Sequence, residues 1–143
     1  MGIFKKKQVA KNTPILINKI IKYPKWSYVY NIETDEFFLI LEKTKKKFIS
    51  KKAFNSWNVF SIVGNTKNLS NHLLDGKIGF RPGTLIKCIS EEPFYLVDSG
   101  NIIHQINNPE VFEIGYSYDN CYIISKEELD FHEKGDPINS VFL

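Results

Sequence analysis

An internal repeat with an offset of about 57 residues constrains this chain more than any other feature of its sequence. The identities between the two copies are few, but the apolar positions keep their register. The aligned pairs are 28–32 with 85–89, 37–40 with 94–97, Ile49 with Ile106 and, after one and then a few extra residues, 53–54 with 111–112 and 62–63 with 123–124. Self-similarity of this kind is typical of a duplicated structural unit. The alternative is two unrelated β-meanders that agree by chance.

Within each copy the pattern predicts four short strands. The expected strands are 26–32, 37–41, 46–49 and 59–63 in the first copy, and 84–89, 94–97, 102–106 and 121–124 in the second. The segment 98–101, Asp-Ser-Gly-Asn, is expected to form a hairpin turn, because Gly and Asn accept positive φ angles. Asn108 and Pro109 predict the start of a short helix that ends before Gly115. Ser125 and Glu128 have the spacing of a helix capping box.

The predicted fold class is therefore α+β, with two tandem β-rich repeats, each a small antiparallel sheet carrying one or two short helices. The expected division is a basic flexible arm at 1–13, a first repeat unit at 14–82 and a second at 83–143. The predicted core residues are Phe38, Leu39, Ile49, Phe54 and Ile62 in the first unit, with Tyr95, Leu96, Ile106, Phe112 and Ile123 as their counterparts.

A resemblance to a known module adds to this prediction. In order and spacing, the second unit contains Tyr95-Leu96-Val97, Gly100, Pro109-Glu110-Val111-Phe112, Gly115-Tyr116, Ile123-Ile124-Ser125 and Glu128-Leu129. It resembles a repeat of roughly fifty residues that recurs in tandem in bacterial surface proteins and in some phage structural proteins. The first unit matches loosely, since it lacks the Gly turn and the Pro-Glu pair. The resemblance implies an interaction or architectural role, and it brings no catalytic residues.

No grouping of reactive side chains predicts an enzyme, a cofactor or a metal site. His72, His104 and His132 are scattered, and neither Cys88 nor Cys121 joins them at ligand spacing. We expect His104 to lie on a sheet face and His132 on a solvated helix face. The two cysteines are expected to be free thiols, with a disulfide as the alternative.

The charge is divided unevenly along the chain. Residues 1–90 contain 17 Lys/Arg and 5 Asp/Glu, a net charge of +12, whereas residues 91–143 contain 2 Lys and 11 Asp/Glu, a net charge of −9. Such a division bears on association rather than on fold. It predicts a head-to-tail homo-oligomer, or a basic half that faces a foreign partner. The candidate partner-binding residues are Lys5, Lys6, Lys7, Lys45, Lys46, Lys47, Tyr116, Tyr118 and Phe131, with Phe142 as a further apolar candidate.

These observations predict a non-catalytic structural or interaction protein that contacts other protein subunits. The sequence shows no membrane span and no export signal. A tailed-phage virion component, in the capsid or the tail and made in the host cytoplasm, combines these features with the resemblance. The alternative is a cytoplasmic nucleic-acid-binding or regulatory protein that uses the basic N-terminal half. Against nucleic acid stands the single arginine, Arg81, since arginine supplies most bidentate phosphate and base contacts.

Overall fold

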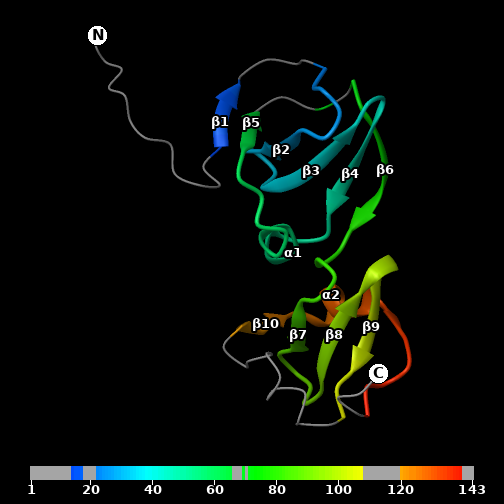
Figure 1. Ribbon diagram of the computed structural model, residues 1–143. Coiled ribbons are helices and arrows are strands. Elements are labelled where there is room, and N and C mark those ends of the chain that lie inside the picture. The colour runs from blue at the N-terminus through cyan, green and yellow to red at the C-terminus, as the bar shows by residue number, and fades with distance from the viewer. Residues whose placement is uncertain (1–13, 18–21, 66–68, 70, 108–119, 140–143) are drawn as a thin grey trace. The chain divides into compact units, whose positions relative to one another are not determined.

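A computed structural model describes residues 14–17, 22–65, 69, 71–107 and 120–139 (Figure 1). The chain divides into two compact units. Unit 1 consists of residues 1–47 and 58–76, and unit 2 of residues 48–57 and 77–143. The segment 48–57 therefore belongs to the unit formed mainly by the second half of the chain. By this division unit 1 has 12 Lys and 5 acidic residues, and unit 2 has 7 Lys/Arg and 11 acidic residues, so their net charges are +7 and −4.

Unit 1 is built on a six-stranded sheet. Its strands are β1 (Pro14–Ile17), β2 (Tyr28–Asn31), β3 (Glu36–Leu41), β4 (Thr44–Phe48), β5 (Ile62–Asn65) and β6 (Leu73–Ile78), in the order β1-β5-β2-β3-β4-β6. The β2–β3 and β3–β4 pairs are antiparallel, whereas β5 runs parallel to both β2 and β1. The core is formed by Tyr23, Val29, Phe38, Ile40 and Leu69.

Unit 2 is built on a five-stranded sheet. Its strands are β7 (Leu85–Cys88), β8 (Phe94–Asp98), β9 (Ile102–Gln105), β10 (Tyr122–Ile124) and β11 (Glu133–Lys134), in the order β10-β7-β8-β9-β11. Two short helices, α1 (Lys51–Asn55) and α2 (Lys126–Asp130), pack in this unit. The core is formed by Ala53 of α1, Leu129 of α2 and the side chains Phe80, Ile86, Cys88, Tyr95, Val97, Ile103 and Ile124.

The two sheets share one topology over five strands. The order β5-β2-β3-β4-β6 in unit 1 corresponds to β10-β7-β8-β9-β11 in unit 2. The strands β2 and β7 each have an antiparallel neighbour on one side and a parallel neighbour on the other. The paired residues also correspond: Val29 lies opposite Phe38, and Ile86 lies opposite Tyr95, which is the predicted offset of 57.

The turns that precede β2 and β7 have the same backbone hydrogen bonds. Trp26 N–H donates to the Ile40 carbonyl at 2.7 Å, and Gly83 N–H donates to the Val97 carbonyl at 2.8 Å. The carbonyls of Pro24 and Arg81 accept from the residues three positions later, at 3.2 and 3.1 Å. Trp26 and Gly83 both have positive φ, 73° and 92°. A four-residue turn of type II needs a positive φ at its third position, which glycine adopts freely and tryptophan does not.

The extra residues of the second unit enter earlier than the sequence alignment predicts. After β4, Ile49 N–H donates to the Ile78 carbonyl, whereas after β9 it is Asn107, not Ile106, whose N–H donates to the Ile138 carbonyl. One extra residue therefore lies in the β8–β9 hairpin turn. At the parallel strand, Val63 lies opposite Val29, and Tyr122 lies opposite Ile86, so the offset there is 59. The sequence alignment predicts an offset of 61 there, and a difference of two residues leaves each side chain on the same face of the strand.

The predicted core was only partly correct. Phe38, Phe54, Ile62 and Tyr95 are buried as predicted, but Ile123 is 42% exposed and Ile124 is buried in its place. Four other predicted core residues are half-buried: Leu39, Ile49, Leu96 and Ile106. Phe112 lies outside the described residues.

The described elements are mostly β, and the sheets are mixed rather than antiparallel. The expected antiparallel sheets were wrong because the strand after the hairpin pair returns beside the first strand through a long connection, and such a crossover makes the pair parallel. The predicted turn is confirmed at Ser99–Asn101, with φ of 71° at Gly100. The capping box of Ser125 and Glu128 is also confirmed. The predicted helix after Asn108 lies outside the described residues.

Candidate functional site

Unit 2 contains a pocket with a volume of about 580 Å³. It is lined by the turn at Pro82 and Gly83, by residues of β8 and β9, and by the segment 136–139 that follows β11. Most of the lining is apolar, and it includes Leu96 and Ile138. The charged side chains among the lining residues are Asp98, His104 and Asp136. An apolar pocket with a few convergent polar groups is the usual form of a ligand site.

The central polar residue of the pocket is His104, on β9. Its Nε2 lies 2.9 Å from Oδ2 of Asp98, and its Nδ1 lies 2.6 Å from the carbonyl oxygen of Asp136. Both partner atoms are acceptors, so the geometry favours a ring with a hydrogen on each nitrogen. The hydrogen bond to the Asp98 carboxylate, followed by the one to the Asp136 carbonyl, raises the pKa of His104. The same bond to His104 lowers the pKa of Asp98.

This hydrogen bonding decides what the histidine can do. A general base needs an imidazole nitrogen with a free lone pair within reach of the substrate. Both nitrogens of His104 are occupied as donors, and Asp98 also accepts from Ser99 N–H at 2.7 Å. The arrangement therefore suits binding and orientation of a ligand better than proton abstraction.

Gly83 lines this pocket without a side chain. A Cβ atom built on Gly83 would meet nothing within 4 Å. At the equivalent turn position unit 1 has Trp26, whose side chain is 61% exposed and lies beside Lys25, with the ammonium 5.3 Å from the ring centroid. The same backbone turn thus presents a bulky indole in one unit and open space in the other.

Three of the predicted partner-binding lysines are already engaged within unit 1. Lys45 donates to the Leu69 carbonyl at 3.0 Å and lies over the Phe38 ring; Lys46 donates to the Asp75 carbonyl at 2.8 Å; and Lys47 pairs with Glu36 at 2.8 Å. Burial lowers the pKa of Lys45. These lysines are half-buried, and their contacts compete with phosphate binding. The nucleic-acid hypothesis therefore loses part of the patch on which it was based.

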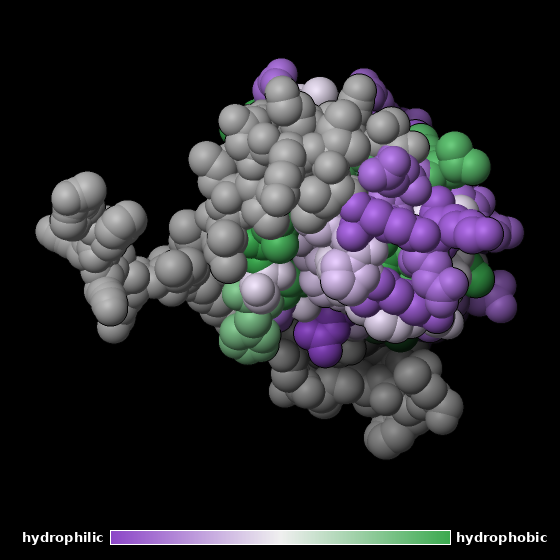
Figure 2. Space-filling model, turned by 90° about the horizontal axis from the view of Figure 1, so that it is seen from above, coloured by the Kyte–Doolittle hydropathy of each residue, from purple (hydrophilic) through white to green (hydrophobic). Residues whose placement is uncertain are grey.

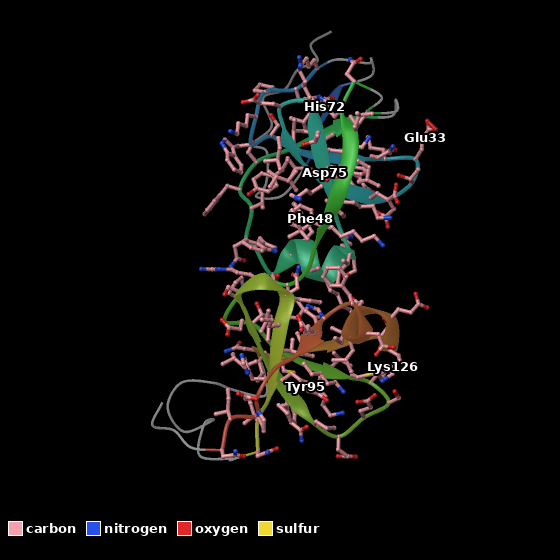
Figure 3. All side chains as sticks on the ribbon, turned by 90° about the vertical axis from the view of Figure 1, so that its right-hand side faces the viewer. Glu33, Phe48, His72, Asp75, Tyr95 and Lys126 are labelled. Atoms are coloured by element: carbon pink, nitrogen blue, oxygen red, sulfur yellow. The ribbon has the colours of Figure 1, made fainter. Side chains whose placement is uncertain are left out.

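The surface around this strand is nevertheless polar. Figure 2, seen from above, shows hydrophilic side chains gathered on the right-hand side of the view, where β3, β4 and β6 lie in Figure 1. Exposed Glu42 and Lys43 close the β3–β4 hairpin there. Figure 3 shows Asp75 on β6, whose carbonyl accepts from Lys46.

The remaining predicted site residues are placed as follows. Phe131 is half-buried, and its ring packs edge-on against His132 with centroids 5.2 Å apart. That contact gives Phe131 a role inside unit 2. Lys5, Lys6, Lys7, Tyr116, Tyr118 and Phe142 lie outside the described residues.

Two histidines occupy equivalent buried positions at the ends of the units. His72 and His132 each precede the last strand, each donates its N–H to a leucine carbonyl at 3.0 Å, and each packs against an aromatic ring about 6 Å away, at 6.3 Å for Tyr23 and 6.0 Å for Phe80. His72 is 1% exposed, and Figure 3 shows it beside the start of β6. Its Nε2 accepts from Tyr23 N–H, and its Nδ1 donates to the Glu42 carbonyl.

His132 differs from His72 in one hydrogen bond. Its Nδ1 donates to the Glu128 carbonyl at 2.9 Å, but no described residue offers a partner to its buried Nε2. Burial lowers the pKa of His132. The expectation of a solvated helix face was wrong, because the short helix ends before His132 and the chain turns inward there.

The sequence missed the pocket and its polar centre. His104 was correctly placed on a strand, but its partners Asp98 and Asp136 lie 6 and 32 positions away, and nothing local pairs them. A signal that was available is the Pro82-Gly83 dipeptide, which marks a type II turn. Cys88 and Cys121 are both free thiols.

Comparison with protein-family models, curated proteins and solved structures finds no match to this chain. Within the described ranges, no helix is long and apolar enough to cross a membrane. Among the same residues, no three His, Cys, Asp or Glu side chains are grouped in a way that could hold a metal ion.

Proposed function

We propose that this chain is a non-catalytic interaction protein made of two diverged copies of one β module, and that the pocket of unit 2 binds a segment of a partner protein. The observation that carries the proposal is the difference between Gly83 and Trp26 at the same turn position. A shared scaffold whose surface differs at one accessible turn is what diverged binding modules have.

The chemistry of the pocket indicates the kind of segment. Its apolar walls suit an aliphatic or aromatic side chain. The carboxylates of Asp98 and Asp136 are exposed, and His104 compensates one of them, so the site favours a neighbouring positive charge. We therefore infer an extended peptide that places an apolar side chain next to a Lys or Arg.

The test is a selection of peptides from a random library on the full chain, followed by affinity measurements by fluorescence anisotropy. Gly83→Trp fills the pocket, and Trp26 shows that this turn accommodates tryptophan. We expect Gly83→Trp to weaken binding at least tenfold. Trp26→Gly, the same exchange in the other unit, is the matched control and should leave binding unchanged. Peptides that bind wild type and Gly83→Trp equally would refute the proposal.

The setting we propose is a tailed-phage virion, in which the partner is another structural subunit. This rests on the resemblance of residues 84–138 to a module found in phage structural and bacterial surface proteins. Mass spectrometry of purified particles tests it directly. Finding the protein abundant in infected cytoplasm but missing from the particles would refute the virion setting and leave the pocket proposal standing.

A further inference from the structure

The two sheets differ in the number of strands on one side. In unit 1 the strand β5 is covered by a sixth strand, β1, which runs parallel to it. In unit 2 the equivalent strand, β10, is the last strand of the described sheet. The pairing registers show that β5 and β10 occupy equivalent positions. Gly64 lies opposite Tyr30, and Ile123 lies opposite the residue equivalent to Tyr30, which is Lys87.

The backbone of β10 directs pairing groups toward this edge. Ile124 turns its carbonyl toward the β7 side, where Ile89 N–H donates to it at 2.9 Å. Because successive residues of a strand direct their hydrogen-bonding groups to opposite sides, the N–H and carbonyl of Ile123 point away from β7. The ammonium of Lys52 on α1 donates to the Ile123 carbonyl, which is where an N–H of an added strand would donate.

Apolar side chains accompany this edge. Unit 2 has two large hydrophobic side chains that are exposed among its described residues, Ile89 at 74% and Ile123 at 42%. Both belong to the β7–β10 end of the sheet, since Ile89 bonds to Ile124. An exposed strand edge flanked by apolar side chains is a template for pairing with another chain.

The four edge strands of the two described sheets are not alike. The edge strand β6 contains Asp75 and Lys77 and is interrupted by Gly76 at φ 96°. The edge strand β11 is two residues long, both charged, and Pro137 follows it. These are features that prevent edge pairing. The other two, β1 (Pro-Ile-Leu-Ile) and β10 (Tyr-Ile-Ile), carry no charge. The strand β1 belongs to unit 1, and β10 belongs to unit 2.

We propose that β10 of one copy pairs along the outer edge of β1 of a second copy. The six-stranded sheet of one molecule then continues into the five-stranded sheet of the next. Net charges of +7 on unit 1 and −4 on unit 2 favour this contact over one between like units. The two edges are different surfaces, so the contact is heterologous and builds a ring or a filament.

The experiment measures the size of the full chain by sedimentation velocity and light scattering. Wild type should associate as its concentration rises, and the association should fade over about the first 0.2 M of salt. Ile123→Pro removes the outward N–H of β10 without removing a bond to β7, and proline is tolerated on an edge strand for that reason. It should abolish association. Ile123→Val keeps the N–H and is the control, and Lys52→Met, which frees the Ile123 carbonyl, should strengthen association severalfold.

Mixing distinguishes this contact from a symmetric one. The Ile123→Pro copy keeps an intact β1, so a small fraction of it should add to one end of a wild-type assembly and shorten it. In a β10-to-β10 dimer the variant would not join wild type at all.

Circular dichroism must show that Ile123→Pro is folded; if it is not, Ile123→Lys takes its place. A wild-type protein that is monomeric at every salt and concentration, or association that survives the blocking variant, would overturn the proposal. Gly83→Trp should not change association, which separates this contact from the pocket.

Discussion

Trp26 and Gly83 occupy the same position of the same turn, with φ of 73° and 92° and matching backbone hydrogen bonds to β3 and β8. One unit keeps glycine, which the conformation favours, and the other carries a bulky residue that the conformation disfavours. Strain of this kind at an exposed residue is an indication that the side chain has a use.

The turn predicts opposite effects for two exchanges. Trp26→Gly should raise the free energy of unfolding by about 1 kcal/mol, because a non-glycine residue in the left-handed region costs about 1–2 kcal/mol and glycine returns part of this as chain entropy. Gly83→Ala should lower it by about 1 kcal/mol through the backbone alone, since its Cβ meets no atom within 4 Å. Urea denaturation measures both. If both variants changed the free energy of unfolding in the same direction, the two turns would not share the conformation described above.

The burial of Phe54 on α1 gives the next prediction. This side chain is 2% exposed and packs edge-on against Phe48 with centroids 5.0 Å apart. Phe54→Ala should therefore destabilise the protein by about 3–5 kcal/mol. Ile89→Ala, at an exposed position, should change stability by less than about 0.5 kcal/mol. Thermal and urea unfolding of both variants would check the values, and a small effect at Phe54 would contradict the burial of its side chain.

A single carboxylate holds the first turns of both helices of unit 2. Glu128 accepts from the Ser50 hydroxyl, the cap of α1, at 2.6 Å, and from Ser125 N–H, the cap of α2, at 2.9 Å. Glu128→Ala should cost about 1–3 kcal/mol, since two caps lose a partner. Glu127→Ala, one position earlier and exposed, should cost less than about 1 kcal/mol. Similar losses for the two would show that Glu128 acts only through the helix dipole.

His132 should make the protein less stable in mild acid. Burial lowers its pKa in the folded state, so the unfolded chain binds more protons below the ordinary histidine pKa of about 6.5. The stability contribution of His132 is present above that pH and is lost as the pH falls toward the lowered folded pKa. In His132→Asn this loss should disappear. Urea unfolding of wild type and variant between neutral and acidic pH would show it, and parallel curves would contradict it.

His104 should have the opposite dependence. Asp98 and the Asp136 carbonyl raise its folded pKa, so its contribution is fully present below the unfolded pKa of about 6.5 and is lost as the pH rises through the raised folded pKa. The stability difference between wild type and His104→Asn should therefore shrink from mildly acidic to alkaline pH. A difference that grows with pH would show that the ring is neutral in the folded protein.

Local patterns in the sequence determined the elements that rest on neighbouring residues. The offset of 57 through Val29, Phe38, Ile86 and Tyr95 is visible because apolar alternation marks one face of a strand. The Ser125–Glu128 capping box and the turn at Gly100 were predicted because their chemistry lies within four residues.

Only the tertiary structure decided which distant segments meet. The parallel return of β5 and β10, the partners of Lys45, Lys46 and Lys47, the burial of His132 and the pairing of His104 with Asp136 all join residues whose contact no local pattern encodes. The exposure of Ile123 and the burial of Ile124 have the same origin. Alternation in a strand fixes that two faces exist, but packing against a particular neighbour decides which of them is buried.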